Sequence, residues 1–321
     1  METSRLKPRI PSRIEGTKIR PPMNLEVIVT DHCNITCRQC NHISPIMRKW
    51  NADVDLVETT LNRLSKVYHC DRLRLLGGEP LLHPRFVELV RIAKRSAIGE
   101  VVQLTTNGML LDQLSDEGWD TLDEIELSLY ELSGRSPEWI AAIQDKGKVH
   151  GTIVNVARYP NFRMTFTARP AENPALVEDV WQACKMANVW GCHALRGNRI
   201  YRCPQSIYAP TLNGGSMEEE GFAITNSPSL RDELLSYLNA PGPLKSCSHC
   251  VGSSGRQFLQ EGMARKVWRN DLDSLYEDLI DYELLERSKI EEQKIDDCRS
   301  PLETRSKRRN PIGKIRTLLT R

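Results

Sequence analysis

The stretch Asp31-His-Cys-Asn-Ile-Thr-Cys-Arg-Gln-Cys-Asn-His42 is the most informative part of this chain. It places Cys33, Cys37 and Cys40 within eight residues, in the spacing C-x3-C-x2-C. The apolar run Leu25 to Val29 precedes them and predicts a strand, so the cysteines should lie on the loop that leaves its C-terminal end. Functional groups of α/β folds gather at that end of a strand. Three thiolates on one loop can hold three irons of a cubane and leave the fourth iron open.

This spacing resembles the signature of the radical S-adenosylmethionine (SAM) enzymes. The resemblance implies a 4Fe-4S cluster whose open iron binds SAM, and an electron that cleaves SAM to methionine and a 5'-deoxyadenosyl radical, which takes a hydrogen atom from a substrate. Gln39 departs from the family pattern, which usually has an aromatic or similar side chain just before the third cysteine. A zinc site is the alternative, since His32 or His42 could supply the fourth ligand that zinc usually requires.

Two further segments follow in the order that the family shows. The stretch Leu73-Arg-Leu-Leu-Gly-Gly-Glu-Pro80 closes a second predicted strand, where glycines let a ligand approach and a carboxylate can accept from an ammonium group. A third predicted strand, Val101 to Thr105, ends in Thr105-Thr106-Asn107-Gly108. Taken singly, each segment could be an ordinary strand-end turn. The resemblance implies that these residues contact the methionine and ribose parts of SAM: Gly77, Gly78, Glu79, Pro80, Thr105, Thr106 and Asn107.

Composition is that of an enzyme with a large core. The chain has 321 residues, of which 40% are hydrophobic, and it carries a net charge of +2. We find no apolar run long enough to span a membrane and no signal peptide, so we expect a soluble, cytoplasmic protein. Ten cysteines without a secretion signal favour metal ligation over disulfides. From Arg299 onward there are eight Lys or Arg against one acid, Glu303, so the body is slightly acidic and is not expected to bind nucleic acid.

Strands and helices are predicted in alternation. The strands are Leu25 to Val29, Leu73 to Leu76, Val101 to Thr105, Glu124 to Leu129, Thr152 to Val156 and Phe162 to Thr167. The helices are Leu56 to His69, Pro84 to Ala97, Leu110 to Trp119, Pro137 to Gln144 and Pro174 to Ala187. Alternation of this kind implies an α/β fold with a parallel sheet covered by helices. The resemblance sharpens this to a partial (β/α)6 barrel of the radical SAM type.

A second group of cysteines surrounds a predicted hairpin. Gly197-Asn198 is a two-residue turn signal, and a central turn there would place residues whose numbers sum to 395 opposite each other. Cys192 and Cys203 would then be a cross-strand pair. Cys247 and Cys250, in a later C-x2-C, supply two more thiolates. Four such cysteines can bind zinc or a full cubane, and spacing alone favours zinc.

Placed after a radical SAM barrel, this cysteine pattern resembles the twitch appendage, the shortened SPASM module. The resemblance implies a second, auxiliary 4Fe-4S cluster held by Cys192, Cys203, Cys247 and Cys250. Cys184, nineteen positions before Cys203, is the alternative first ligand. It shares a predicted helix face with Val177 and Val180, so it also fits a small buried hydrophobe. Cys70 and Cys298 are not assigned to either cluster; with Cys184 they are the spare thiols that could donate a hydrogen atom in an epimerase.

The chain is expected to divide into five parts. These are an N-terminal tail (1–22), the barrel (23–190), the cluster-binding appendage with its β-hairpin (191–260), a C-terminal helical segment (261–298) and a basic tail (299–321). The helical segment rests on a charged pattern from Val267 to about Ile295, with apolar positions at Leu272, Leu275, Leu279 and Tyr282.

A small-molecule substrate is favoured, because about 22 residues before the first strand are too few for the recognition domain that peptide-modifying relatives often carry. The architecture resembles the twitch-bearing alcohol dehydrogenases of aminoglycoside biosynthesis. It implies oxidation of a secondary alcohol on a sugar- or aminocyclitol-like metabolite, with a reducing partner such as flavodoxin or ferredoxin. Candidate substrate-binding residues are Arg158 and Arg169, at the ends of the last two strands, and Tyr130 after the fourth.

Three alternatives to this oxidation stay open. The first is an epimerase of a similar substrate, which would need a thiol to return a hydrogen atom. The second is a radical SAM enzyme that modifies a peptide or protein. The third is a non-catalytic interaction protein with zinc at both sets of cysteines.

Overall fold

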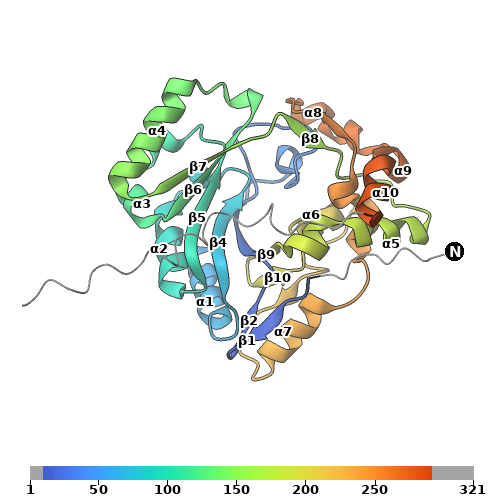
Figure 1. Cartoon of the computed structure of the whole chain (residues 1–321), viewed down its shortest axis with the longest axis horizontal. Coiled ribbons are helices and arrows are strands. Elements are labelled where there is room, and N and C mark those ends of the chain that lie inside the picture. The colour runs from blue at the N-terminus through green and yellow to red at the C-terminus, as the bar shows by residue number, and fades with distance from the viewer. Residues whose placement is uncertain (1–9, 291–321) are drawn as a thin grey trace, which may run out of the picture.

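The computed structural model describes residues 10–290 of the chain. Its centre is an eight-stranded sheet in the order β11-β10-β9-β3-β4-β5-β6-β7 (Figure 1). The strands are β3 (Asn24–Thr30), β4 (Cys70–Gly77), β5 (Gly99–Thr106), β6 (Glu124–Leu129), β7 (Ile153–Arg158), β9 (His193–Arg196), β10 (Arg199–Tyr201) and β11 (Phe222–Ala223). From β9 to β7 neighbouring strands run parallel, whereas β10 and β11 add antiparallel pairs at one edge. The fold is therefore α/β with a largely parallel sheet that is open at β7 and β11.

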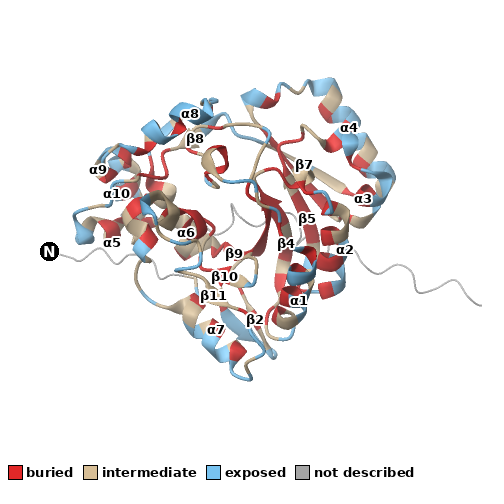
Figure 2. Ribbon diagram, turned by 180° about the vertical axis from the view of Figure 1, so that it is seen from behind, coloured by how far each residue is buried: buried red, intermediate tan, exposed pale blue. Residues whose placement is uncertain are grey.

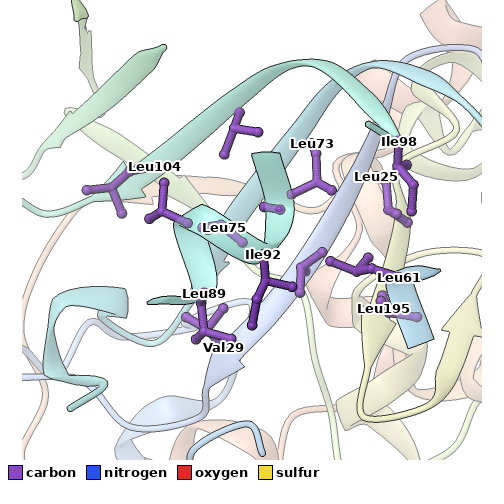
Figure 3. Close-up of a cluster of buried hydrophobic side chains, with 14 of the residues drawn as sticks. Leu25, Val29, Leu61, Leu73, Leu75, Leu89, Ile92, Ile98, Leu104 and Leu195 are labelled. Carbon is purple, nitrogen blue, oxygen red and sulfur yellow. The ribbon is translucent and has the colours of Figure 1, made fainter. Parts of the chain in front are cut away.

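Four helices cover one side of the parallel strands: α1 (Val54–Leu64), α2 (Phe86–Ser96), α3 (Asp116–Thr121) and α4 (Pro137–His150) (Figure 1). Alternate residues of a strand point to opposite faces, so Leu73 and Leu75 of β4 face the same side. They meet Leu61 of α1 and Leu89 and Ile92 of α2 in the main hydrophobic core (Figure 3). Burial of this apolar surface holds the helices on the sheet.

The remaining elements lie around the sheet. A small hairpin is formed by β1 (Arg13–Glu15) and β2 (Lys18–Arg20), and a second two-stranded sheet by β8 (Asn161–Arg163) and β12 (Gln257–Leu259). The other helices are α5 (Pro174–Ala183), α6 (Gln205–Tyr208), α7 (Leu230–Asn239), α8 (Arg265–Trp268), α9 (Tyr276–Leu279) and α10 (Tyr282–Ile290). In both ribbon views α5, α8, α9 and α10 lie across the molecule from α2 and α3, and the strands between them are mostly buried (Figures 1 and 2).

The predicted strand Phe162 to Thr167 is wrong as a member of the central sheet. Only Asn161–Arg163 is a strand, and it pairs antiparallel with β12. The residues after it bond to the C-terminal part of the chain, since Met164 N donates to Arg256 O at 2.9 Å and Thr167 N to His249 O at 3.0 Å. These distant partners draw the segment away from β7. The sixth parallel strand is instead β9, on the far side of β3.

The predicted hairpin register is confirmed. Arg196 pairs with Arg199, Leu195 with Ile200 and Ala194 with Tyr201, and Gly197 has the positive φ of 58° that its turn position requires. The ladder ends there, so Cys192 and Cys203 are not a cross-strand pair. Because β9 pairs with β3, the hairpin extends the central sheet, and the boundary expected after residue 190 does not separate two sheets.

The C-terminal helical pattern is broken into short pieces rather than forming one helix. Between α8 and α10 lie a 3-10 turn, Arg269–Leu272, and α9. Leu272 and Leu279 are buried, whereas Leu275 and Tyr282 are 48% and 50% exposed. The end of the predicted pattern beyond residue 290, Cys298, the basic tail and residues 1–9 lie outside the described residues. No helix within 10–290 is long and apolar enough to cross a membrane.

Candidate functional site

The three clustered cysteines lie on the loop after β3, at the C-terminal edge of the parallel strands. Cys37 is buried, and Cys33 and Cys40 are half-buried. Burial is the main reason that the pKa of Cys33 and of Cys37 is raised to about 12, and repulsion between neighbouring thiolates of this set raises both further. The three sulfurs are thus close enough to interact. A bound metal would favour the thiolate forms that burial disfavours.

Two side-chain amides point at these sulfurs. Asn107 Nδ2 lies 3.6 Å from Cys33 Sγ and donates to Asn34 Oδ1 at 2.7 Å. Gln260 Nε2 lies 3.4 Å from Cys37 Sγ. An amide N–H is a donor, and donors directed at cysteine sulfur are typical of iron-sulfur sites. The surroundings of the loop therefore fit thiolate sulfurs that ligate a cluster.

The glycine pair at the end of β4 brings the Gly-Gly-Glu-Pro segment against the cysteine loop. A Cβ on Gly77 would lie 2.2 Å from Thr30 O, and one on Gly78 would lie 2.1 Å from His32 O. The backbones are bonded here, since Gly78 N donates to Thr30 O at 2.8 Å and Glu79 N to His32 O at 3.0 Å. No side chain fits between these backbones, so the glycines are required for the loop to dock on the strand.

The carboxylate of Glu79 links two predicted SAM-binding segments. It is fully buried and accepts from Thr106 Oγ1 at 2.7 Å, from Asn107 N at 2.9 Å and from Leu81 N at 3.1 Å. Burial raises the pKa of Glu79 to about 7, although these donors act in the opposite direction. Pro80 follows, buried at the first position of a 3-10 turn. Glu79 therefore positions Asn107, whose amide reaches the cysteine loop.

A set of polar side chains lies on the face of the strands opposite α1 and α2, and sequence analysis missed it. Arg74 Nε donates to Gln103 Oε1 at 2.8 Å and Nη2 to Thr105 Oγ1 at 3.1 Å. The same guanidinium pairs with Glu126 at 2.8 Å and with Glu26 at 3.5 Å. We call these five residues the polar layer. Charged residues at alternate positions of otherwise apolar strands were the available signal, because period two assigns them to one face.

Of the three candidate substrate-binding residues, Tyr130 is half-buried and the two arginines are exposed. Its pKa is raised by burial first and then by the thiolates of Cys37 and Cys40. Its ring is 5.9 Å from that of Tyr159, whose pKa is raised by burial and then by Glu126. Tyr130 therefore lies between the cysteine loop and the polar layer. Arg158 is exposed at the end of β7, and Arg169 is exposed with Nη1 3.4 Å from Asp273 O.

The second set of cysteines gathers around Gly252. Gly252 N lies 3.4 Å from Cys250 Sγ, and a Cβ on Gly252 would lie 2.6 Å from Cys184 Sγ. Burial raises the pKa of Cys250, and the thiolates of Cys203, Cys184 and Cys247 are the next causes. The structure thus brings Cys203, Cys247 and Cys250 together with Cys184.

Cys192 has a different environment. It is 6% exposed, and after burial the charged groups that most affect its pKa are Glu26 and Arg74 of the polar layer, followed by Cys203 and Cys184. Cys184 is free to join the other set because α5 ends at Ala183 and Cys184 is extended, with ψ of 112°. The predicted helix face that would have buried it therefore does not exist at this position. The arrangement favours the alternative first ligand, Cys184, over Cys192.

Within residues 10–290 no three His, Cys, Asp or Glu side chains converge as they would around a single ion. Cysteines that ligate a cubane each bind a different iron, whereas those of a zinc site share one ion at about 2.3 Å. Both sets supply enough thiolates to ligate a multi-iron group. Cys70 belongs to neither, since it is fully buried and donates to Arg72 O at 3.3 Å.

Comparison with known proteins matches residues 27–156 to the radical SAM superfamily. The chain is 40% identical over 108 residues to the GTP 3',8-cyclase of Chlorobaculum tepidum, which covers 33% of this chain and 32% of that enzyme. It is 31% identical over 127 residues to the PqqA peptide cyclase of Gluconobacter oxydans, which covers 39% of this chain and 35% of that enzyme. The chain thus matches about a third of the length of these curated relatives.

Among solved structures, BtrN in complex with AdoMet and 2-DOIA has a TM-score of 0.44 and 15% identity, over 72% of this chain and 93% of BtrN. The family match contains the cysteine loop, the Gly-Gly-Glu-Pro segment and the Thr-Thr-Asn-Gly segment. The second set of cysteines lies outside it.

Proposed function

Because residues 27–156 are a radical SAM domain, we propose that Cys33, Cys37 and Cys40 hold a 4Fe-4S cluster whose open iron binds SAM. When bound, this cluster supplies the electron that cleaves SAM, so that a 5'-deoxyadenosyl radical can take a hydrogen atom from the substrate. The observation that carries the proposal is the contact between the three motifs at one sheet edge. Glu79 holds Asn107, and Asn107 Nδ2 reaches Cys33 Sγ at 3.6 Å.

The chain's own residues have distinct roles in this site. We assign Gly77, Gly78 and Pro80 to the backbone surface on which SAM lies, and Glu79 and Thr106 to holding that surface rigid through their 2.7 Å hydrogen bond. Thr105 accepts from Arg74 and therefore belongs with the polar layer rather than with SAM. The nine described cysteines are all free thiols, which supports a cytoplasmic enzyme reduced by a partner such as flavodoxin or ferredoxin.

We place the substrate at the polar layer, next to Tyr130. Two carboxylates, Glu26 and Glu126, share one guanidinium, Arg74, so this layer is at most neutral. A nucleoside triphosphate, as in the name of the GTP 3',8-cyclases, would meet no excess of positive charge there. Hydroxyl and amino groups suit these acceptors and donors better. The layer therefore supports a sugar- or aminocyclitol-like metabolite of the kind used in natural product biosynthesis.

For the reaction we propose oxidation of a secondary alcohol to a ketone. After loss of a hydrogen atom the substrate must still give up one electron and one proton. Glu26 and Glu126 are placed to take the proton. Cys184, Cys203, Cys247 and Cys250 would hold an auxiliary 4Fe-4S cluster, which supplies an electron acceptor.

Epimerisation is the second candidate, and the position of Cys192 favours it. This thiol is buried, and Glu26 and Arg74 of the polar layer are near enough to affect its pKa, so we propose Cys192 as the hydrogen-atom donor that an epimerase would need. A peptide substrate, as in the name of the PqqA peptide cyclase, is a further alternative with no contact in the described residues to favour it.

The test uses anaerobically reconstituted protein and a variant with Cys33, Cys37 and Cys40 all changed to alanine. This variant should produce no 5'-deoxyadenosine from SAM under reductant, whereas Cys70→Ala, a buried thiol outside both sets, should remain active. Formation of 5'-deoxyadenosine by the triple variant would refute the proposal. In deuterated water, oxidation gives a ketone lighter by two hydrogens, while an inverted carbon carrying solvent deuterium would establish the epimerase.

A further inference from the structure

Residues 257–272, which we call the strap, cross the loop that carries the first three cysteines. The two backbones are paired, because Arg38 N donates to Glu261 O at 3.0 Å and Met263 N to Thr36 O at 2.8 Å. Trp268 Nε1 donates to Cys37 O at 2.9 Å from a fully buried ring. The strap comes from the far end of the described chain and lies outside the family match. It is a feature of this chain that the family motifs do not specify.

Two residues of the cysteine loop lock the strap in place. Arg38 donates to Asp271 through Nε at 3.0 Å and Nη2 at 2.8 Å. Gln39 is 1% exposed, and its Nε2 donates to Asp271 Oδ2 at 2.9 Å while its Oε1 accepts from Thr165 N and Phe166 N at 3.0 Å. Gln39 replaces the family's usual aromatic residue, and here it joins the loop to two distant segments. We call Arg38, Gln39 and Asp271 the clamp.

The strap delivers one side chain to a cluster sulfur. Gln260 is 6% exposed, and its Nε2 lies 3.4 Å from Cys37 Sγ. Its Oε1 is buried and has no hydrogen-bond partner among the described residues. An unpaired buried carbonyl is destabilising, so packing alone would favour an apolar residue at this position. The contact that accounts for an amide here is the one to the sulfur.

We propose that Gln260 is a positioning residue that sets the reduction potential of the SAM-binding cluster through its N–H···S contact with Cys37. This inference rests on the proposed function. Reduction adds negative charge to a cluster, and an N–H donor at a ligating sulfur stabilises the more negative state, which raises the potential. The clamp holds the strap, and with it the amide, at that sulfur.

The experiment is a redox titration of full-length, reconstituted protein, followed by the electron paramagnetic resonance signal that changes when SAM is added. Gln260→Leu keeps the size of the side chain and removes the donor. At a fixed potential it should lower the ratio of reduced to oxidised cluster about ten-fold, which is a midpoint shift of about 59 mV for one electron. Gln260→Glu should lower it further, because a carboxylate opposes the added charge. Gln257→Leu, an exposed glutamine in strand β12, which ends just before Gln260, is the matched control and should leave the midpoint unchanged.

Iron content and melting temperature are measured on each variant. A wild-type midpoint in Gln260→Leu with full iron content would overturn the inference. Loss of the cluster from both Gln260 variants, with iron kept in Gln257→Leu, would also overturn it, since the amide would then serve assembly rather than potential. A wild-type protein without any SAM-sensitive signal would refute the proposed function as well, so the two failures are distinguishable.

Discussion

Among single residues, Cys184 and Cys192 show how one helix end decides a ligand set. Both are cysteines at a plausible spacing from Cys203, and a regular helix through Ala187 would have kept Cys184 on a buried face. Because α5 ends at Ala183, Cys184 meets Gly252 and the Cys250 region instead. The pKa of Cys192 is raised by burial first, and Glu26 and Arg74 are the next groups that affect it.

This difference predicts the iron content of two single variants. Cys184→Ser should lose the auxiliary cluster and about half of the iron, because one of two cubanes is lost. Cys192→Ser should keep both clusters. Iron and sulfide analysis with Mössbauer spectroscopy measures this. The reverse pattern, with iron lost only from Cys192→Ser, would restore Cys192 as the ligand.

Glu79 predicts a pH dependence of stability for the metal-free protein. The pKa of its carboxyl group is about 4.5 in the unfolded chain, and burial raises this pKa to about 7 in the folded chain. The folded chain therefore binds more protons between these values, and its free energy of unfolding falls as the pH rises through this interval, by roughly 3 kcal/mol. The free energy of unfolding, measured with urea at pH 5 and at pH 8, should differ less between the two pH values in Glu79→Gln than in the wild type. Glu131→Gln, at an exposed position, should behave like wild type, and an unchanged pH dependence in Glu79→Gln would contradict the assignment.

Among the elements, the end of β4 determines how the cysteine loop is held. The loop backbone rests directly on Gly77 and Gly78, so its position depends on two missing side chains. The strand that carries these glycines also carries Arg74 of the polar layer. One strand therefore supports both the cluster loop and the proposed substrate site.

Gly78→Ala should disrupt this docking. Its Cβ would lie 2.1 Å from His32 O, and neither backbone can move away without breaking strand hydrogen bonds. We expect the free energy of unfolding to fall by about 1–3 kcal/mol. We also expect iron to be lost from the first cluster. Thermal unfolding and iron analysis measure both. In the control Gly262→Ala, the nearest atom is a Leu132 methyl carbon at 3.2 Å, which can rotate away. Equal effects of the two substitutions would show that close backbone contact is not the cause.

Across the whole molecule, the clamp joins segments from opposite ends of the described chain. Arg38 and Asp271 are separated by 233 positions, and their side chains are 26% and 11% exposed. The loop that carries the first three cysteines is therefore stabilised by the C-terminal segment as well as by the strands of the central sheet.

A double-mutant cycle of Arg38→Ala and Asp271→Ala tests this coupling. The interaction energy from urea unfolding should be about 1–3 kcal/mol, because a bidentate, partly buried pair loses little to solvent. The control is the exposed pair Arg95–Glu58, whose side chains are 59% and 41% exposed. The same cycle on this pair should give an interaction energy of about 0–1 kcal/mol. A coupling at Arg38–Asp271 no larger than in this control would show that the clamp does not hold the strap.

The sequence by itself determined the cysteine motif, the alternation of strands and helices, and the register of the hairpin at Gly197-Asn198. These features depend on residues close together in the chain, where side-chain period and turn chemistry act directly. Only the tertiary structure decided that Phe162 to Thr167 leaves the central sheet, that Cys184 joins the second set of cysteines, and that Gln260 reaches Cys37. Each of these depends on contacts between segments that lie far apart in sequence. Local spacing carries no information about such partners, because they are selected by packing of the whole chain.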